Sequence, residues 1–277
     1  MQVQILGLCR FSYLGLRGFQ VEHERLEDRR AFLYDPERLA RRWFWFENVT
    51  LPALRAQTDP AFTLVVMTGP DLPEPFLTHL REAEATIPQL KLSLVPPMNY
   101  HLAACDHAVR PFRKAGAEVI GHFRMDDDDA VAVDFVERAR RDFRLVEAAC
   151  AQHGGAAIDY MRGLLLSASA RGLKVTPRVF HNASAALVVY LPPEDLRTAV
   201  HLAHWRIAEL VPTLGLADSP MLCRLLTGDN DSGAAGPGYD WETAEDKVAL
   251  MWDRFRLRRW ALHRAAKTGG RDAEAAR

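Results

Sequence analysis

The chain has 277 residues, of which 48% are apolar and 26% charged, and its formal net charge is −1. The length suffices for one large domain with a sizeable core, and the balanced charge argues against a general nucleic-acid binder. No run reaches the ~18 consecutive apolar residues expected of a membrane span, and the first residues lack the features of a signal peptide. We therefore expect a cytoplasmic protein whose scattered cysteines are reduced thiols.

Apolar runs and helix-like patterns alternate along the first half of the chain. Such alternation predicts an α/β fold with a mostly parallel sheet and helices on both of its faces. The predicted strands cover residues 3–8, 62–67, 90–95 and 119–125. The predicted helices cover residues 36–57, 73–85 and 101–115.

The second half is less regular. A predicted helix over 130–152 precedes short apolar runs typical of antiparallel or edge strands, at 157–160, 163–168, 173–176 and 185–191. Residues 201–210 fit a strand or a helix, the Gly- and Asp-rich segment 227–239 predicts a loop, and 241–264 has a helical pattern. We predict one domain over residues 1–240, followed by a C-terminal helix and tail over 241–277.

Four consecutive aspartates, Asp126 to Asp129, follow the predicted strand 119–125. Helix capping accounts for one or two of them, with Asp129 as a candidate cap, but four are more than capping needs. Carboxylates this close repel one another unless they are solvated or bind a cation. Because α/β proteins bind ligands at the carboxyl ends of parallel strands, the run predicts a site for a divalent cation and a diphosphate.

Three segments resemble known glycosyltransferases. The stretch NVTLPALRAQTDPAF over 48–62 is similar to the segment between the first helix and second strand of inverting GT-A glycosyltransferases. FRMDDDD over 123–129 resembles their DxD motif. GLCRFS over 7–12 and TGDN over 227–230 resemble the bacterial rhamnosyltransferase family more specifically.

This resemblance implies a GT-A-like fold and metal-dependent transfer of a sugar, with rhamnose a candidate, from a nucleotide-diphosphate donor to a glycan or lipid-linked acceptor. It further implies inversion of configuration and a Mn²⁺ or Mg²⁺ ion held by Asp126, Asp128 and His204. Imidazole suits Mn²⁺ better than Mg²⁺. The candidates for nucleotide-sugar binding are Arg10, Phe11, Asp71, Arg113, Asp126 and Asp127. Strand alternation points Arg124 away from Phe123 and Met125, so its role is open.

An inverting transfer needs a general base for the acceptor hydroxyl. Asp229, in the TGDN segment, is the first candidate and Asp218 the second; Asp231, His181, His201 and His204 are further ones. A turn residue is the alternative for Asp229, because Gly-Asp-Asn suits a turn without any chemistry.

The C-terminal pattern WDRFRLRRWALHR mixes aromatic and basic residues. Such a helix can lie on an anionic membrane, which suits a lipid-linked acceptor, or it can pack its aromatic side on the domain, which we favour. Two other functions remain open. A nucleotidyltransferase would carry a Gly-rich phosphate loop where this chain has CRFS, and a non-catalytic cation-binding relative would use the aspartates only to order a loop.

Overall fold

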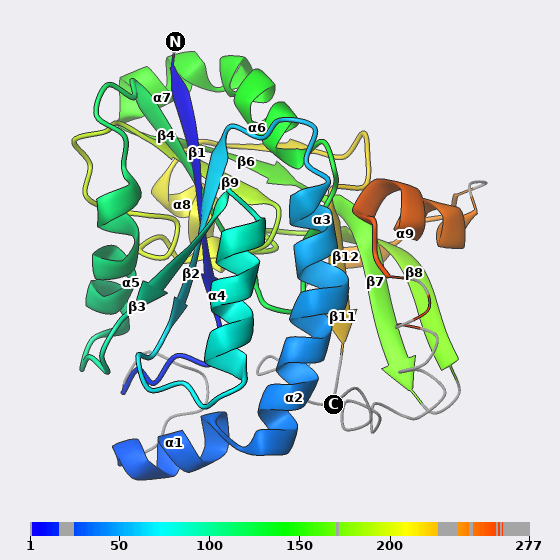
Figure 1. Cartoon of the computed structure of the whole chain (residues 1–277). Helices are drawn as coiled ribbons and strands as arrows, with labels where there is room; N and C mark the ends of the chain where they lie inside the picture. Colours follow the sequence, from blue (N-terminus) through cyan, green and yellow to red (C-terminus); the bar gives the residue numbers. More distant parts are fainter. Residues whose placement is uncertain are drawn as a thin grey trace.

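The computed structural model describes residues 2–16, 25–169, 172–226, 238–243, 246–258, 260 and 262, and a seven-stranded sheet forms its centre (Figure 1). The strand order is β10-β6-β9-β4-β1-β2-β3, and β9 alone among these runs antiparallel to its neighbours. The strands are β1 (Val3–Arg10), β2 (Phe62–Thr68), β3 (Leu90–Leu94), β4 (Val119–Asp126), β6 (Ala156–Tyr160), β9 (Leu187–Leu191) and β10 (Thr213–Leu216). The prediction of an α/β fold with a mostly parallel central sheet is confirmed in this arrangement.

A second sheet of five strands has the order β12-β8-β7-β11-β5. Its strands are β5 (Ala130–Val131), β7 (Arg162–Ser169), β8 (Gly172–Phe180), β11 (Leu222–Leu226) and β12 (Gly238–Asp240). The long β7–β8 hairpin projects from one side of the molecule (Figure 1). Because β5 follows the aspartates directly, this sheet begins where the acidic run ends.

Helices cover both faces of the central sheet. They are α1 (Leu26–Leu33), α2 (Pro36–Trp45), α3 (Leu51–Arg55), α4 (Phe76–Thr86), α5 (His101–Val109), α6 (Phe135–Asp142), α7 (Glu147–His153), α8 (Ile207–Leu210) and α9 (Lys247–Phe255), with single turns η1 (Phe46–Thr50), η2 (Arg110–Phe112), η3 (Phe143–Leu145) and η4 (His204–Arg206). Side chains of α2, α3, α4 and α6 pack with Ile5 and Cys9 of β1 on one face. Those of α5 pack with Leu6 and Leu8 on the other, as the period-2 alternation of a strand requires.

Two of the predicted helices differ from the structure. A helix from residue 130 is wrong, because residues 130–131 pair with β11 and α6 begins only at Phe135, after Asp134. Asp129 is therefore not a helix cap. The helix predicted over 241–264 is shorter, since α9 spans Lys247–Phe255.

The apolar side of α9 packs against the core of the protein. Leu250, Met251 and Phe255 are buried in the same core as β7 and β11. The domain division at residue 240 stays a prediction. In the described part of the chain, no helix is long and apolar enough to cross a bilayer.

Candidate functional site

The register of β1 and β4 brings Arg10 and Asp126 together. These two strands are parallel, and Arg10 and Asp126 form the last pair of their register. The guanidinium of Arg10 lies 3.8 Å from the Asp126 carboxylate, whose side chain is 54% exposed. A cation and a carboxylate thus meet at the carboxyl edge of the sheet, where open α/β sheets bind their ligands.

Several cations surround Asp126. Arg124 lies two residues earlier on β4, so strand alternation places it on the side of Asp126, away from Phe123 and Met125. Burial raises the pKa of Asp126, but Arg10, Arg124, Arg42 and Arg224 outweigh it and hold that pKa below its ordinary value. Asp126 is therefore ionised at neutral pH, in a strongly cationic setting.

Two histidines lie beside these charges. His101 Nε2 is 3.0 Å from Arg10, and burial together with that arginine lowers the pKa of His101 to about 3. His204 Nδ1 lies 2.5 Å from the carbonyl oxygen of Asn182. Burial and Arg124 lower the pKa of His204, whereas its hydrogen bond to Asn182 and the charge of Asp126 raise it.

The next two aspartates are buried. Asp127 and Asp128 are 2% and 1% exposed, and both contact Arg42 of α2, which is itself 8% exposed. Arg42 Nε donates to Asp127 at 3.1 Å, a second Arg42 nitrogen pairs with the same carboxylate, and Arg42 Nη1 donates to Asp128 at 3.0 Å. Burial raises the pKa of Asp128 despite Arg42, and it raises that of Asp129 well above the ordinary value.

The segment 48–62 is built into the same unit. Thr50 donates to the carbonyl oxygen of Asp129 at 2.8 Å. Gln57 donates to the carbonyl oxygen of Ala132 at 2.8 Å and accepts from the Val136 N–H at 3.0 Å. The two stretches that resemble glycosyltransferases are thus joined by hydrogen bonds, and the first fixes the chain on the far side of the aspartates.

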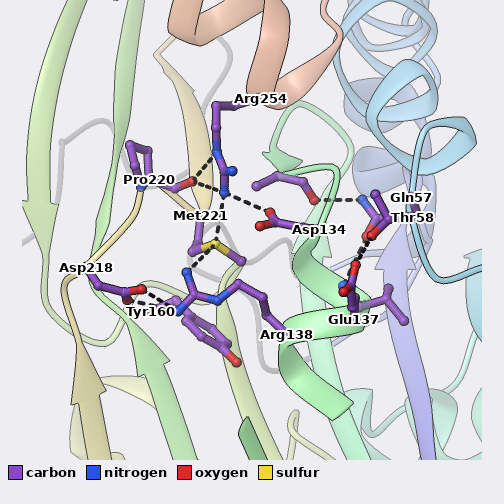
Figure 2. A network of polar contacts seen from close by, with 12 residues as sticks. Gln57, Thr58, Asp134, Glu137, Arg138, Tyr160, Asp218, Pro220, Met221 and Arg254 are labelled. Atoms are coloured by element: carbon purple, nitrogen blue, oxygen red, sulfur yellow. Dashed lines mark hydrogen bonds and ion pairs between the residues drawn. The ribbon is translucent and has the colours of Figure 1, made fainter. Parts of the chain in front are cut away.

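An arginine network holds the chain beyond the run (Figure 2). Arg138 of α6 donates to both oxygens of Asp218, at 2.9 and 2.7 Å, and its Nε lies 3.5 Å from Asp142. Arg254 of α9 donates to Asp134 at 2.7 Å and to the carbonyl oxygen of Pro220. Arg254 therefore ties α9 to the segment that follows the aspartates.

The structure separates the other candidates. Asp71, after β2, accepts from Tyr34 at 3.2 Å and pairs with Arg30. Phe11 is fully buried against Trp43 and Phe46, so its ring packs in the core.

Arg113 lies near His122, four residues before Asp126, and donates to the carbonyl oxygen of Arg197 at 2.9 Å. The described structure does not bring it to Arg10 and Asp126. Asp229 and Asp231 lie outside the described residues.

The described residues do not form a complete metal site by themselves. Among the described residues, no three His, Cys, Asp or Glu side chains gather in a way that could hold a metal ion. Mg²⁺ sites on phosphate substrates, however, commonly use one or two protein carboxylates and take further oxygens from the phosphates. The exposed carboxylate of Asp126 and the second ring nitrogen of His204 suit Mn²⁺ in such a site, whereas Asp128 contacts Arg42.

Sequence reasoning missed Arg42 and His101. Both come from helices far from the run in sequence, and no local pattern marks them. Arg124 could have been placed, because it has the same strand parity as Asp126.

The fold and this edge define an α/β protein that carries charged side chains of both signs at the carboxyl ends of its parallel strands. The family model described as "Putative rhamnosyl transferase" matches residues 4–239, and the chain belongs to this family. A comparison with curated proteins gives no match.

Among solved structures, the chain is similar to S. aureus TarS 1-349 in complex with UDP-GlcNAc, with 12% identity, a TM-score of 0.43, and coverage of 83% of this chain and 61% of that one. It is also similar to the same protein in complex with UDP, with 14% identity, a TM-score of 0.38, and coverage of 82% and 61%. The chain thus spans about three fifths of the length of these structures.

Proposed function

We propose that this protein is a metal-dependent glycosyltransferase that moves a sugar, with rhamnose the candidate from its family, from a nucleotide-diphosphate donor to a glycan or lipid-linked acceptor. The observation that carries the proposal is the exposed Asp126 carboxylate, placed by strand register beside Arg10 and two residues after Arg124 on the same strand. A diphosphate and a divalent cation together match this mixture of charges.

Each residue of this edge has a part in the proposed reaction. Arg10 and Arg124 bind the diphosphate and offset the negative charge that develops on the leaving phosphate. Asp126 and His204 would hold Mn²⁺ or Mg²⁺, which when bound supplies Lewis-acid stabilisation of the same charge. Arg42 keeps Asp127 and Asp128 in place, and through them it fixes the backbone next to Asp126.

Inversion of configuration requires a base on the acceptor side, and Asp229 remains our first candidate. Asp218 is a weaker one. Burial raises the pKa of Asp218, but its two hydrogen bonds from Arg138 outweigh this and hold the pKa below its ordinary value. A carboxylate with both oxygens on an arginine is a poorer proton acceptor.

The test is a thermal-shift panel of nucleoside diphosphates, with and without Mn²⁺, on the whole protein. A ligand that binds only the folded state stabilises it by about 2.7 kcal/mol at a hundred times its Kd. We expect a thymidine or uridine diphosphate to raise the Tm only when Mn²⁺ is present. Asp126→Asn should abolish this shift without unfolding the protein, whereas Asp253→Asn, on the exposed side of α9, should leave it intact.

Two results would contradict the proposal. A nucleotide response that does not need metal would refute the metal dependence alone. A wild-type protein that binds no nucleoside diphosphate would favour a non-catalytic, cation-binding relative. If a nucleoside diphosphate does respond, transfer assays with nucleotide sugars of that base identify the sugar and the acceptor.

A further inference from the structure

Two hydrogen bonds link Asp159, Asn182 and His204 in a chain. Asp159 is the fourth residue of β6 and is 4% exposed. Its Oδ2 accepts from the backbone N–H of Asn182 at 2.8 Å. The carbonyl oxygen of Asn182 lies 2.5 Å from His204 Nδ1. The backbone of Asn182 thus joins three separate segments of the chain.

This geometry determines which nitrogen of His204 carries the proton. A carbonyl oxygen only accepts hydrogen bonds, so Nδ1 must be the donor. In the neutral imidazole the lone pair then belongs to Nε2. The same arrangement, with one ring N–H on a backbone carbonyl, orients histidines that bind metals.

The conformation of Asn182 is suited to this bridge. Its φ is 55°, in the left-handed region that asparagine enters more readily than most residues. In this turn, after β8, its N–H meets Asp159 and its C=O meets His204.

Asp159 is a costly residue at this place. Its other carboxylate oxygen, Oδ1, is buried and has no hydrogen-bond partner among the described residues. A buried carboxylate with one oxygen unpaired destabilises the folded state, and such groups gather at functional sites. A role in the site accounts for it.

We propose that Asp159 and Asn182 are positioning residues, which hold His204 in the Nδ1–H tautomer so that Nε2 keeps its lone pair for the site at Asp126. The use of that lone pair as a metal ligand rests on the proposed function, whereas the tautomer itself does not. The two ideas can therefore fail separately.

His201 provides an internal comparison. Its Nδ1 lies 3.1 Å from the backbone N–H of Thr198, which can only donate. Nδ1 of His201 must therefore be the acceptor, and the neutral ring carries its proton on Nε2. Two histidines three residues apart should show opposite tautomers.

The experiment is a long-range ¹H–¹⁵N correlation spectrum of the histidine rings in the whole protein, without metal or nucleotide. It is recorded at about pH 8, above the ordinary histidine pKa of ~6.5. His204→Gln and His201→Gln assign the signals. We expect His204 with its proton on Nδ1 and His201 with its proton on Nε2.

Variants then test the positioning. Asp159→Ala removes the acceptor for the Asn182 N–H and should lower the Nδ1–H to Nε2–H ratio of His204 by roughly fivefold, the size expected from one hydrogen bond. Asp159→Asn keeps an accepting oxygen and Asn182→Gly keeps both backbone groups with a positive φ, so both should retain the wild-type tautomer. The tautomer of His201 should not change in any of them.

The proposal is overturned if wild-type His204 carries its proton on Nε2, or if folded Asp159→Ala keeps the wild-type ratio. Should Asp159→Ala fail to fold, Asn182→Val takes its place, because a β-branched residue disfavours the left-handed turn. An unchanged His204 tautomer in that folded variant would likewise refute the role of the turn.

Discussion

Two kinds of carboxylate meet at the carboxyl edge of the central sheet, and they differ in what surrounds them. Asp126 is half exposed and faces Arg10, whereas its neighbours Asp127 and Asp128 are buried on Arg42. Four identical residues in a row therefore divide into one that a ligand can reach and others that hold the structure. Side-chain direction and partner decide the role, and residue type alone does not.

This division changes the choice of residue for testing the site. The resemblance assigns Asp128 to the metal, which would make Asp128→Ala the obvious variant for testing metal-dependent activity. Because Asp128 is 1% exposed and paired with Arg42, that substitution also leaves a buried arginine without part of its compensation. Asp126 is half exposed, so its loss should affect ligand binding more than folding.

The largest expected effect comes from removing the buried ion pairs of Asp127 and Asp128. Arg42→Met keeps much of the volume of the side chain and removes the charge that compensates Asp127 and Asp128. Removing one partner of a buried ion pair costs about 3–5 kcal/mol. We expect a loss of this size in the free energy of unfolding, measured by urea denaturation at pH 7.

Arg41→Met is the matched control, because Arg41 is the adjacent residue of α2. It makes an i,i+4 pair with Glu37 at 3.7 Å. Such pairs contribute about 0.3–0.5 kcal/mol. Equal losses from the two variants would show that Arg42 has no special place under the aspartates.

The next effect is a difference in the pH dependence of stability between Asp159 and Asp126. Burial raises the pKa of Asp159 from 3.8 to about 6. Between these values the unfolded chain releases the proton that the folded protein keeps, so stability falls as pH rises through this window. At pH 7 the penalty is at most about 3 kcal/mol. Asp159→Asn removes it and should therefore gain stability relative to wild type between about pH 4 and pH 7.

Asp126 should show the opposite sign. Its pKa is lowered by the arginines around it, so its ionised form stabilises the folded state above the unfolded-state pKa. That contribution is lost as pH falls through the lowered value. Asp126→Asn should therefore be less stable than wild type by a nearly constant amount from about pH 5 to pH 7, and this deficit should shrink only as pH falls below about 4. Urea denaturation at several pH values measures both slopes, and parallel slopes would contradict the distinction between the two carboxylates.

The sequence was sufficient for much of the fold and for the location of the edge. The apolar runs and the turn residues placed β1, β2, β3 and β4, because each buried strand is bounded by local breakers. The break between Asp129 and α6 was missed because residues 130–131 form β5 by pairing with β11, about ninety residues away. Such pairing leaves little trace in local periodicity.

The site was predictable only as far as strand register carries it. Arg10 and Asp126 end two neighbouring strands, so parallel pairing brings them together. Arg42 reaches the aspartates from a helix 85 residues away in sequence. The bridge from Asp159 to His204 depends on a left-handed turn at Asn182. Helix packing and loop geometry of this kind cannot be read from residue spacing.

The smallest stability effect is expected at Asp218, the second exposed carboxylate and the weaker candidate base. Its side chain is 62% exposed, and exposed ion pairs contribute about 0–1 kcal/mol even when their geometry is good. Asp218→Asn should therefore cost at most about 1 kcal/mol in urea denaturation. If Asp218 only anchors Arg138, its transfer rate should stay within about threefold of wild type, whereas loss of a general base lowers kcat by roughly 10²–10⁴. A collapse of kcat in Asp218→Asn, with full activity in Asp229→Asn, would reverse our order of the two candidates and give this exposed carboxylate a catalytic role.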